Sequence, residues 1–175
     1  MLYLIPAPAH RIVLRLAHRL RLRWWRLRKP RLAGCRVLAL DSEGRVLLVR
    51  HAYGSGKWMT PGGGLRRGED ALAGGQRELL EETSCTLEFA VPLDLLEEQL
   101  NGAVNAVHIV AGLTLDSPIA DGREIIEARF FALHALPEAM SPILREQLPE
   151  WITAATAGRL LDAAAVPSPP PAPTG

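Results

Sequence analysis

Three glutamates lie close together in the stretch TPGGGLRRGEDALAGGQRELLEETSC, which runs from Thr60 to Cys85. On a helix, the spacing of Glu78, Glu81 and Glu82 places their side chains on one face, about 5–6 Å apart. Like charges at this distance repel each other, which favours a helix face that holds a cation. Taken alone, an acidic helix face is more often simply solvated, so the surrounding residues must decide between the two interpretations.

A helix over residues 71–83 would position the three glutamates. Asp70 is available as its N-cap, and a glycine-rich loop, AYGSGKWMTPGGG, precedes it. Gly74 and Gly75 each weaken such a helix by roughly 1 kcal/mol relative to alanine. We therefore expect tertiary contacts to hold this helix in place.

The chain around this helix alternates predicted strands with predicted helices. Strand-forming residues mark the ranges 35–40, 45–51, 86–91, 104–115 and 126–133. An Asp-Ser-Glu-Gly turn between the first two ranges predicts a β-hairpin. A final helical region is expected from about residue 141 to residue 165, with Pro149 restarting the helix. The fold class is therefore α/β (α+β), with a sheet covered by helices.

Length and composition are those of a soluble globular protein with one main domain. The chain has 175 residues, of which 48% are hydrophobic and 22% are charged. It contains no uninterrupted apolar run of about 18 residues that could cross a bilayer. Its two cysteines, Cys35 and Cys85, match neither a zinc motif nor a disulfide framework. We expect a cytoplasmic protein.

Charge divides the chain into a basic arm and an acidic body. Residues 1–31 contain eight arginines and Lys29 without an acidic residue, a charge of +9. The remainder has eleven basic residues against nineteen acidic ones, a charge of −8. We expect three segments: a basic amphipathic helical arm over 1–31, the main domain over 32–165, and a disordered proline-rich tail over 166–175.

The arm has an apolar stripe with helical spacing, and arginines line the opposite side. The stripe consists of Val13, Leu16, Ala17, Leu20, Trp24 and Leu27. Such a helix can dock on the acidic body or on a second subunit, which would give a homodimer. It can also contact an anionic membrane surface through residues 10–29, or act in targeting or nucleic-acid binding. We favour docking, and we expect no specific nucleic-acid binding.

The central motif resembles the signature of the Nudix hydrolases. That signature has a glycine, five residues, a glutamate, seven residues, and then Arg-Glu, an aliphatic residue, any residue, Glu-Glu, any residue, a glycine and an aliphatic residue. Gly63, Glu69 and the run from Arg77 to Glu82 occupy the corresponding positions here. Trp58 and the Pro61-Gly62 pair are also usual in the family. The resemblance implies an α/β/α sandwich with a mixed β-sheet.

Two positions depart from the signature. Ser84 replaces the last glycine, at a helix end where a left-handed residue is commonly needed. A serine there costs on the order of 1 kcal/mol or shifts the turn. Cys85 replaces the final aliphatic residue and can fill the same core position as a small hydrophobic side chain. Neither change removes a charged residue of the motif.

Members of this family cleave within the diphosphate of a nucleoside diphosphate linked to another moiety, and they depend on Mg²⁺ or Mn²⁺. The resemblance implies these metal ligands: the carbonyl of Gly63 and the carboxylates of Glu78, Glu81 and Glu82. Arg77 would orient Glu78 through a charge-assisted pair, and Glu69 would stabilise the unit formed by the loop and the helix. Magnesium prefers such oxygen donors and completes its shell with waters and phosphates.

Substrate contacts are expected from residues around the glycine loop. Arg50 and Tyr53 are candidates for phosphate or base contacts, and Gly62 and Trp58 border the same loop. For Trp58, packing under the loop is favoured over stacking on a base. The histidines at positions 51 and 108 are most simply strand residues.

A further catalytic glutamate is expected in the loop before the last strand, because family members often carry one there. The segment DGREIIEARFFALHALP occupies this place. Glu124 is the preferred candidate and Glu127 is the alternative. Both could instead be solvated charges at the strand edge.

The expected function is Mg²⁺-dependent hydrolysis of a nucleoside diphosphate linked to another moiety. Family substrates include nucleoside triphosphates, nucleotide sugars, dinucleoside polyphosphates, coenzyme A and capped RNA ends, and no motif outside the signature selects one. The alternatives are a non-hydrolytic Nudix module that binds nucleotides as a regulator, and a protein that acts mainly through a membrane-bound basic arm.

Overall fold

A computed structural model gives the fold, and it describes residues 31–100 and 103–157. The predicted arm before residue 31 and the predicted tail lie outside the described residues. The elements are β1 (Arg31–Leu40), β2 (Val46–His51), β3 (Trp58–Met59), β4 (Gly62–Gly64), α2 (Ala71–Thr83), β5 (Glu88–Leu100), β6 (Ala103–Leu113), β7 (Ile125–Phe131), the short 3₁₀ helix η2 (Leu133–Ala135) and α3 (Pro142–Ala157).

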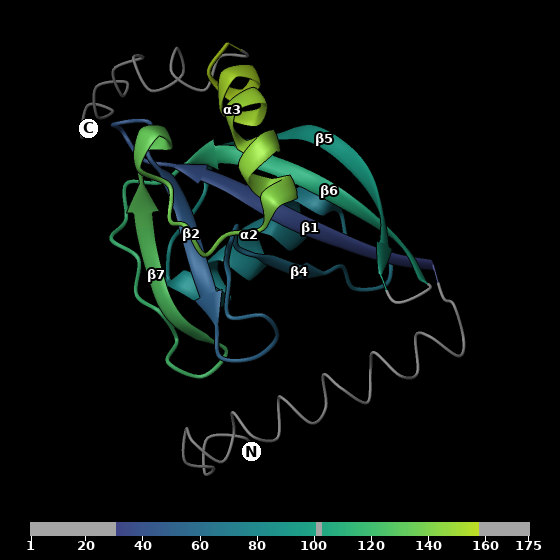
Figure 1. Ribbon diagram of the computed structural model, residues 1–175. Helices are drawn as coiled ribbons and strands as arrows, with labels where there is room; N and C mark the ends of the chain where they lie inside the picture. The colour runs from purple at the N-terminus through teal and green to yellow at the C-terminus, as the bar shows by residue number, and fades with distance from the viewer. Residues whose placement is uncertain (1–30, 101–102, 158–175) are drawn as a thin grey trace, which may run out of the picture.

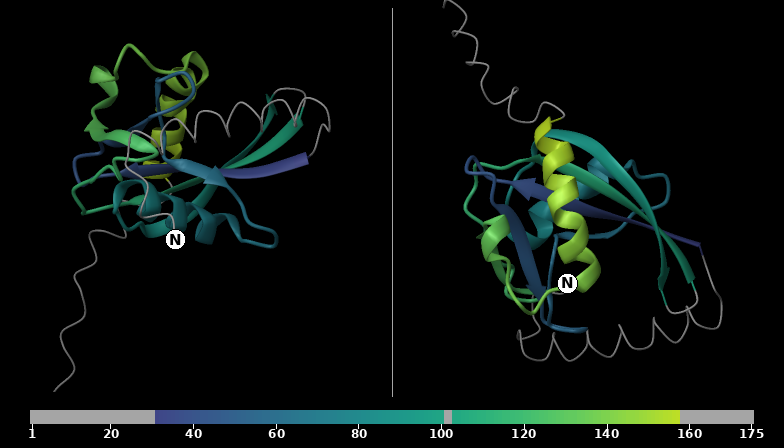
Figure 2. Two further views of the ribbon diagram at one scale, coloured as in Figure 1. Left: turned by 90° about the horizontal axis from the view of Figure 1, so that it is seen from below. Right: turned by 45° about the horizontal axis from the view of Figure 1, so that its top comes forward.

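One mixed sheet of seven strands forms the middle layer of the molecule. Its main path is β3-β2-β1-β6-β5, while β4 pairs with β1 and β7 pairs with β2. Strands β1 and β6 are parallel, and the other pairs are antiparallel. Helix α2 covers one face of the sheet and α3 covers the other (Figure 1, Figure 2). The predicted helix-covered mixed sheet is confirmed.

The central strand β1 contributes side chains to two hydrophobic cores, one on each face of the sheet. Val37 and Ala39 pack in the cluster that contains Leu79 of α2. Leu38 and Leu40 point the other way and pack in the cluster that contains α3. This alternation follows from the two-residue period of a strand. Helix α3 contributes Leu144, Leu148, Trp151 and Ala155 to its core.

Helix α2 has the predicted bounds and is fixed at its start and along its buried face. The Asp70 carboxylate accepts hydrogen bonds from the backbone N–H groups of Leu72 and Ala73, at 2.9 and 3.2 Å. Gly75 faces the sheet so closely that a Cβ there would lie 3.3 Å from Val37. Gly75 thus lets the helix approach the strands, Gly74 lets it approach Leu65 of the preceding loop, and tertiary contacts hold the helix as expected.

Two predictions about the extent of the elements are wrong, one for strand β5 and one for helix α3. Strand β5 was expected to end at residue 91, but it continues through Pro92 to Leu100. The path of the sheet leaves β5 at an edge, where a proline need not donate to a neighbouring strand. Helix α3 runs through Pro149 without restarting. Its buried residues lie on both sides of this proline, so packing against the sheet outweighs the loss of one backbone hydrogen bond.

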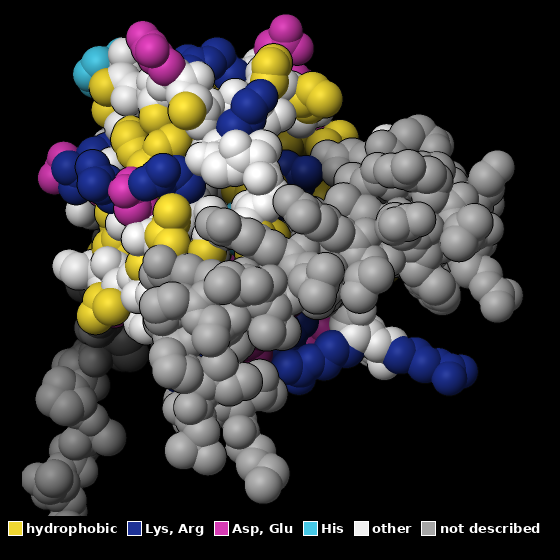
Figure 3. Space-filling model, turned by 60° about the horizontal axis from the view of Figure 1, so that its bottom comes forward, with side chains coloured by type: hydrophobic (Ala, Val, Ile, Leu, Met, Phe, Trp, Pro, Cys, Tyr) yellow, Lys and Arg dark blue, Asp and Glu magenta, His cyan; other side chains and the backbone are white. Residues whose placement is uncertain are grey.

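Charges of both signs are interspersed over the described part of the face in Figure 3, where basic and acidic side chains lie next to each other. The acidic residues of the body therefore do not gather into one patch on this part of the surface. Among the described residues, no helix is both long enough and apolar enough to span a bilayer.

Ser84 ends α2 in the left-handed conformation that the sequence indicates. Its φ and ψ are 58° and 18°, and its N–H donates to the Leu80 carbonyl at 3.0 Å. The next residue, Cys85, is fully buried beside Leu79 and Leu87. The chain therefore keeps the helix end that the signature requires, although it lacks the usual glycine.

Ser84→Gly should stabilise the protein by about 0.5–1 kcal/mol, because glycine adopts a positive φ without the steric cost of a Cβ. Urea unfolding measures the change. Ser84→Ala is the matched control: it keeps the Cβ and should give no gain. A Gly variant that is less stable than the wild type would mean that the serine hydroxyl makes a stabilising contact at this turn.

Candidate active site

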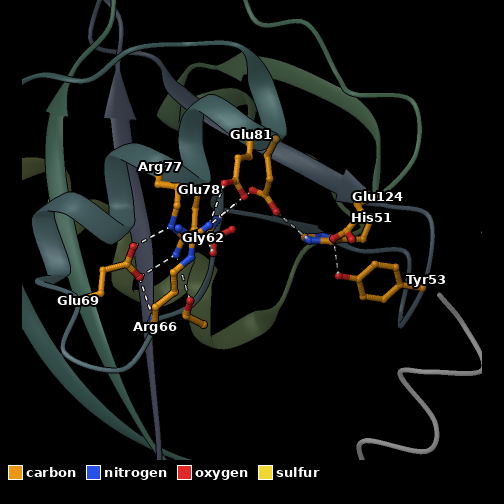
Figure 4. Close-up of polar contacts among 11 residues, drawn as sticks. His51, Tyr53, Gly62, Arg66, Glu69, Arg77, Glu78, Glu81 and Glu124 are labelled. Atoms are coloured by element: carbon orange, nitrogen blue, oxygen red, sulfur yellow. Dashed lines mark hydrogen bonds and ion pairs between the residues drawn. The ribbon is translucent and has the colours of Figure 1, made fainter. Parts of the chain in front are cut away.

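The guanidinium of Arg77 joins the glycine-rich loop to helix α2 (Figure 4). Its Nε donates to Glu69 Oε1 at 2.8 Å, and its Nη2 donates to Glu69 Oε2 at 2.9 Å. Nη1 donates to Glu78 Oε1 at 2.7 Å, and Nη2 also reaches the carbonyl of Gly64 at 3.3 Å. The bidentate pairing with Glu69 fixes the plane of the guanidinium and thus the direction of its hydrogen bond to Glu78.

Glu69 is held in its ionised form. Hydrogen bonds from Arg77, followed by one from the backbone N–H of Arg66, lower the pKa of Glu69 to about 2. The same contact with Glu69 is the main cause that raises the pKa of Arg77 above its ordinary value. The pair therefore stays charged far into the acidic range and keeps the loop closed against the helix.

Glu78 lies in a confined position between α2 and β4. A Cβ added to Gly63 would lie 2.7 Å from the Glu78 carboxylate, so only glycine leaves room for this side chain. Burial is the main cause that raises the pKa of Glu78, the hydrogen bond from Arg77 opposes it, and the charges of Glu82 and Glu81 add to the rise. A cation at this place would favour the ionised form of Glu78.

Glu82 and Glu81 have opposite environments although they are neighbours in the chain. The Glu82 side chain is only 9% exposed, and its Oε2 accepts a hydrogen bond from the Gly62 N–H at 3.0 Å. Its Oε1 lies 3.3 Å from Nε2 of His51. The Glu81 side chain is 54% exposed and has only longer contacts, at 3.4 Å to Arg77 and 3.5 Å to Arg66.

The donors fit a hard divalent cation that is shared with a substrate. Within the described residues, no three acidic, histidine or cysteine side chains form a ready-made metal cage. Magnesium commonly takes one or two carboxylates and completes its shell with waters and substrate phosphates, which these oxygen donors allow. The space that Gly63 leaves beside Glu78 is also consistent with such a cation.

The structure separates the two candidate glutamates near β7. Glu127 is paired with Arg50, which lies opposite it in the register of β2 and β7. Glu124 instead lies near Tyr53 and His51 (Figure 4), and its Oε2 is 3.5 Å from the Tyr53 hydroxyl. The carboxylate of Asp121 accepts the N–H of Glu124 at 3.2 Å, so the turn before β7 holds its backbone.

Arg50 and Trp58 form a neighbouring pair on β2 and β3, opposite each other in the register. The Arg50 guanidinium carbon lies 6.0 Å from the centre of the Trp58 ring. Trp58 is only 8% exposed and makes an edge-to-face contact with Phe131, at 4.9 Å between ring centres. This burial agrees with the packing interpretation of Trp58 and leaves its substrate contact as a prediction.

His51 is the site residue that the sequence interpretation missed. It lies on β2, and Glu82 lies thirty-one positions later on α2, so no local spacing relates them. Their contact depends on how α2 packs against the sheet. A shift in the register of β2 and β7 between Arg50 and His51 adds to this, because such irregularities re-aim side chains.

Comparison with known proteins agrees with this fold. A family model described as the NUDIX domain matches residues 30–151. The chain therefore belongs to the Nudix family and is a Nudix hydrolase. No curated protein sequence matches it.

Solved structures with the same fold include two proteins of the MutT type. A MutT NUDIX hydrolase from Burkholderia pseudomallei has a TM-score of 0.60 and 25% identity, covering 68% of this chain and 96% of that chain. A MutT protein from Methanosarcina mazei Go1 has a TM-score of 0.59 and 24% identity, covering 71% and 94%. A UDP-X diphosphatase has a TM-score of 0.61 and 25% identity, covering 73% of this chain and 64% of that chain.

The three consecutive glycines of β4 should respond differently to replacement by alanine. In Gly62→Ala, the Cβ would lie 2.2 Å from the Cys35 carbonyl oxygen at a φ of 147°, so we expect a loss of roughly 3 kcal/mol or more in stability. In Gly63→Ala, the Cβ meets only the flexible end of Glu78. The fold should persist while activity falls about 10- to 100-fold.

Gly64→Ala is the control for this series, because a Cβ there has no atom within 4 Å. Thermal unfolding and hydrolysis of a nucleotide substrate separate the three outcomes. Full activity of Gly63→Ala would mean that the place of Glu78 against β4 is not needed for catalysis.

Proposed function

We propose that the protein is a Mg²⁺-dependent pyrophosphohydrolase, also able to use Mn²⁺, that cleaves the diphosphate linkage of a nucleoside diphosphate joined to another moiety. The observation that carries this proposal is the confined Glu78 carboxylate. It is half-buried near two other acids and is paired with one guanidinium, which leaves an excess of negative charge for a divalent cation. The UDP-X diphosphatase among the similar structures supports a substrate of this class.

In this proposal, the metal is held by the Gly63 carbonyl and by the carboxylates of Glu78, Glu81 and Glu82. When bound, such an ion neutralises phosphate oxygens and lowers the pKa of an attacking water. Arg77 keeps Glu78 pointing toward the ion, while Glu69 keeps Arg77 in place. Glu81 has the greatest freedom of the three acids and can adjust to the substrate.

Residues around β2 would act on the substrate and on the proton of the attacking water. Glu124 is the proposed base, since its carboxylate lies on the side of Tyr53 and His51 while Glu127 is paired with Arg50. Arg50, Tyr53 and Gly62 are the proposed contacts of the substrate. Trp58 would contribute through its packing beneath Arg50.

Glu82→Gln should lower turnover by a factor of about 10² or more, because the change removes the charge and keeps the shape of a proposed ligand. Formation of the nucleoside monophosphate from a panel of nucleotide derivatives with Mg²⁺ measures the effect. EDTA should abolish activity and added Mg²⁺ should restore it. Glu146→Gln, an exposed position on α3 across the sheet, is the matched control and should behave as the wild type.

Full turnover by Glu82→Gln in excess Mg²⁺ would contradict its role as a principal ligand. Nucleotide binding without formation of the nucleoside monophosphate, across the whole panel, would replace hydrolysis by the regulatory alternative. Either result is distinct from a folding defect, which circular dichroism of the variant detects.

We also propose the division into a basic arm over 1–31, a catalytic domain over 32–165 and a tail over 166–175. The match of the family model to residues 30–151 supports the position of the central segment. Within this proposal, the arm docks on the acidic body or on a second subunit, and a peripheral membrane contact through residues 10–29 is the alternative. A cytoplasmic location stays a prediction.

Deletion of residues 1–29, which leaves β1 whole, should lower the melting temperature or change the elution volume in gel filtration. The reason is that docking would bury the apolar stripe of the arm against the body. If the shortened protein keeps its melting temperature and size, and only the full chain sediments with anionic liposomes, docking is wrong and the membrane contact replaces it.

A further inference from the structure

Glu82 is fixed at both of its carboxylate oxygens, and by two different kinds of group. Oε2 accepts a hydrogen bond from the backbone N–H of Gly62, and Oε1 faces Nε2 of His51 at 3.3 Å. The His51 side chain is 12% exposed and the Glu82 side chain 9% exposed, so little water reaches this contact. A carboxylate held in this way has lost most of its freedom to rotate before any ligand arrives.

The ring of His51 is oriented by packing, since its second nitrogen makes no hydrogen bond with the described residues. Nδ1 is buried and has no partner in this part of the chain. A neutral imidazole has one donor and one acceptor nitrogen, so a proton on Nε2 donates toward Glu82 and leaves Nδ1 as a bare lone pair. The ring of Tyr53 lies edge-to-face on the His51 ring, at 5.2 Å between their centres.

Residues 51–53 also contact Glu124, the proposed base. The N–H of Ala52 donates to the backbone carbonyl of Glu124 at 2.7 Å, and the Tyr53 hydroxyl is 3.5 Å from the Glu124 carboxylate. Residues 51–53 thus contact Glu82 on one side and Glu124 on the other. These two carboxylates come from α2 and from the loop before β7, and the end of β2 with the two residues after it relates them.

We propose that His51 is a positioning residue for Glu82, with the Tyr53 ring fixing the plane of its imidazole. This inference rests on the proposed function, because it gives His51 the task of holding a metal-binding carboxylate in one orientation. A buried polar atom without a partner is costly and calls for a reason. Because Nδ1 has no partner among the described residues, the ring contact with Tyr53 and the contact at Nε2 are what set the direction of the ring toward Glu82.

The test compares His51→Leu with His51→Gln in the full chain. Leucine removes the donor, whereas glutamine can return an N–H near the place of Nε2. Mn²⁺ affinity, measured by electron paramagnetic resonance without substrate, should fall about 10- to 100-fold in His51→Leu. In His51→Gln it should stay within about threefold of the wild type. The Mg²⁺ concentration for half-maximal hydrolysis should rise in parallel in the Leu variant.

Two further variants separate positioning from general stability. Tyr53→Ala removes the ring that packs on His51 and should weaken Mn²⁺ binding, whereas Tyr53→Phe keeps the ring and should bind Mn²⁺ as the wild type does. His134→Leu, an exposed histidine in η2, is the matched control and should change neither measurement. Melting temperatures of all variants identify any that fail to fold, and the comparison between Phe and Ala at position 53 still decides the proposal.

Wild-type Mn²⁺ affinity in His51→Leu would overturn the inference, and so would equal losses in the Leu and Gln variants with unchanged melting temperatures. If the wild type itself neither binds Mn²⁺ nor hydrolyses any nucleotide with Mg²⁺, the proposed function has failed instead. The two failures are therefore distinguishable in one set of measurements.

Discussion

The arrangement of the site depends on one guanidinium placed among four carboxylates. Glu69, Glu78 and Glu81 all lie within 3.4 Å of Arg77, and Glu82 lies one residue further along α2. Without Arg77, the loop and the helix would each present acids to the other, and their repulsion would open the loop. One positive charge cannot neutralise all of them. The loop therefore closes while the outer acids keep a net negative charge.

This balance of charges requires the backbone to come close to neighbouring side chains at more than one point. Gly63 leaves room for Glu78, and Gly75 lets α2 lie against Val37 of β1. Strand β1 takes part in both contacts, because it pairs with β4 and also packs against α2. Its parallel register with β6 fixes it deep in the sheet. The positions of the charged groups in the site are thus set by the packing of β1 against β4 and α2.

Whereas the roles of Arg77 and Glu69 came from the resemblance to the Nudix signature, local pattern was sufficient for α2 and its acidic face and for the hairpin of β1 and β2. These features depend on residues within about one or two turns of each other, where capping, turn chemistry and helical spacing apply. The length of β5 and the continuity of α3 through Pro149 depend on partners far away in the sequence. The contact between His51 and Glu82 is of the same kind. A histidine at the end of an apolar strand has no local feature that distinguishes it from any other strand residue.

The three glutamates of the Nudix signature also differ in the groups that hold their side chains, although the signature does not distinguish them. Glu78 is paired with the guanidinium of Arg77, Glu82 contacts a backbone N–H and an imidazole, and the Glu81 side chain is mostly exposed. A rigid carboxylate costs little entropy when it takes a ligand, whereas a free one can follow a ligand that changes shape. A hydrolase meets a different phosphate geometry before and after cleavage. Under the proposed function, two fixed acids with one mobile acid on the same helix face would therefore combine a defined place for a cation with room for the leaving phosphate.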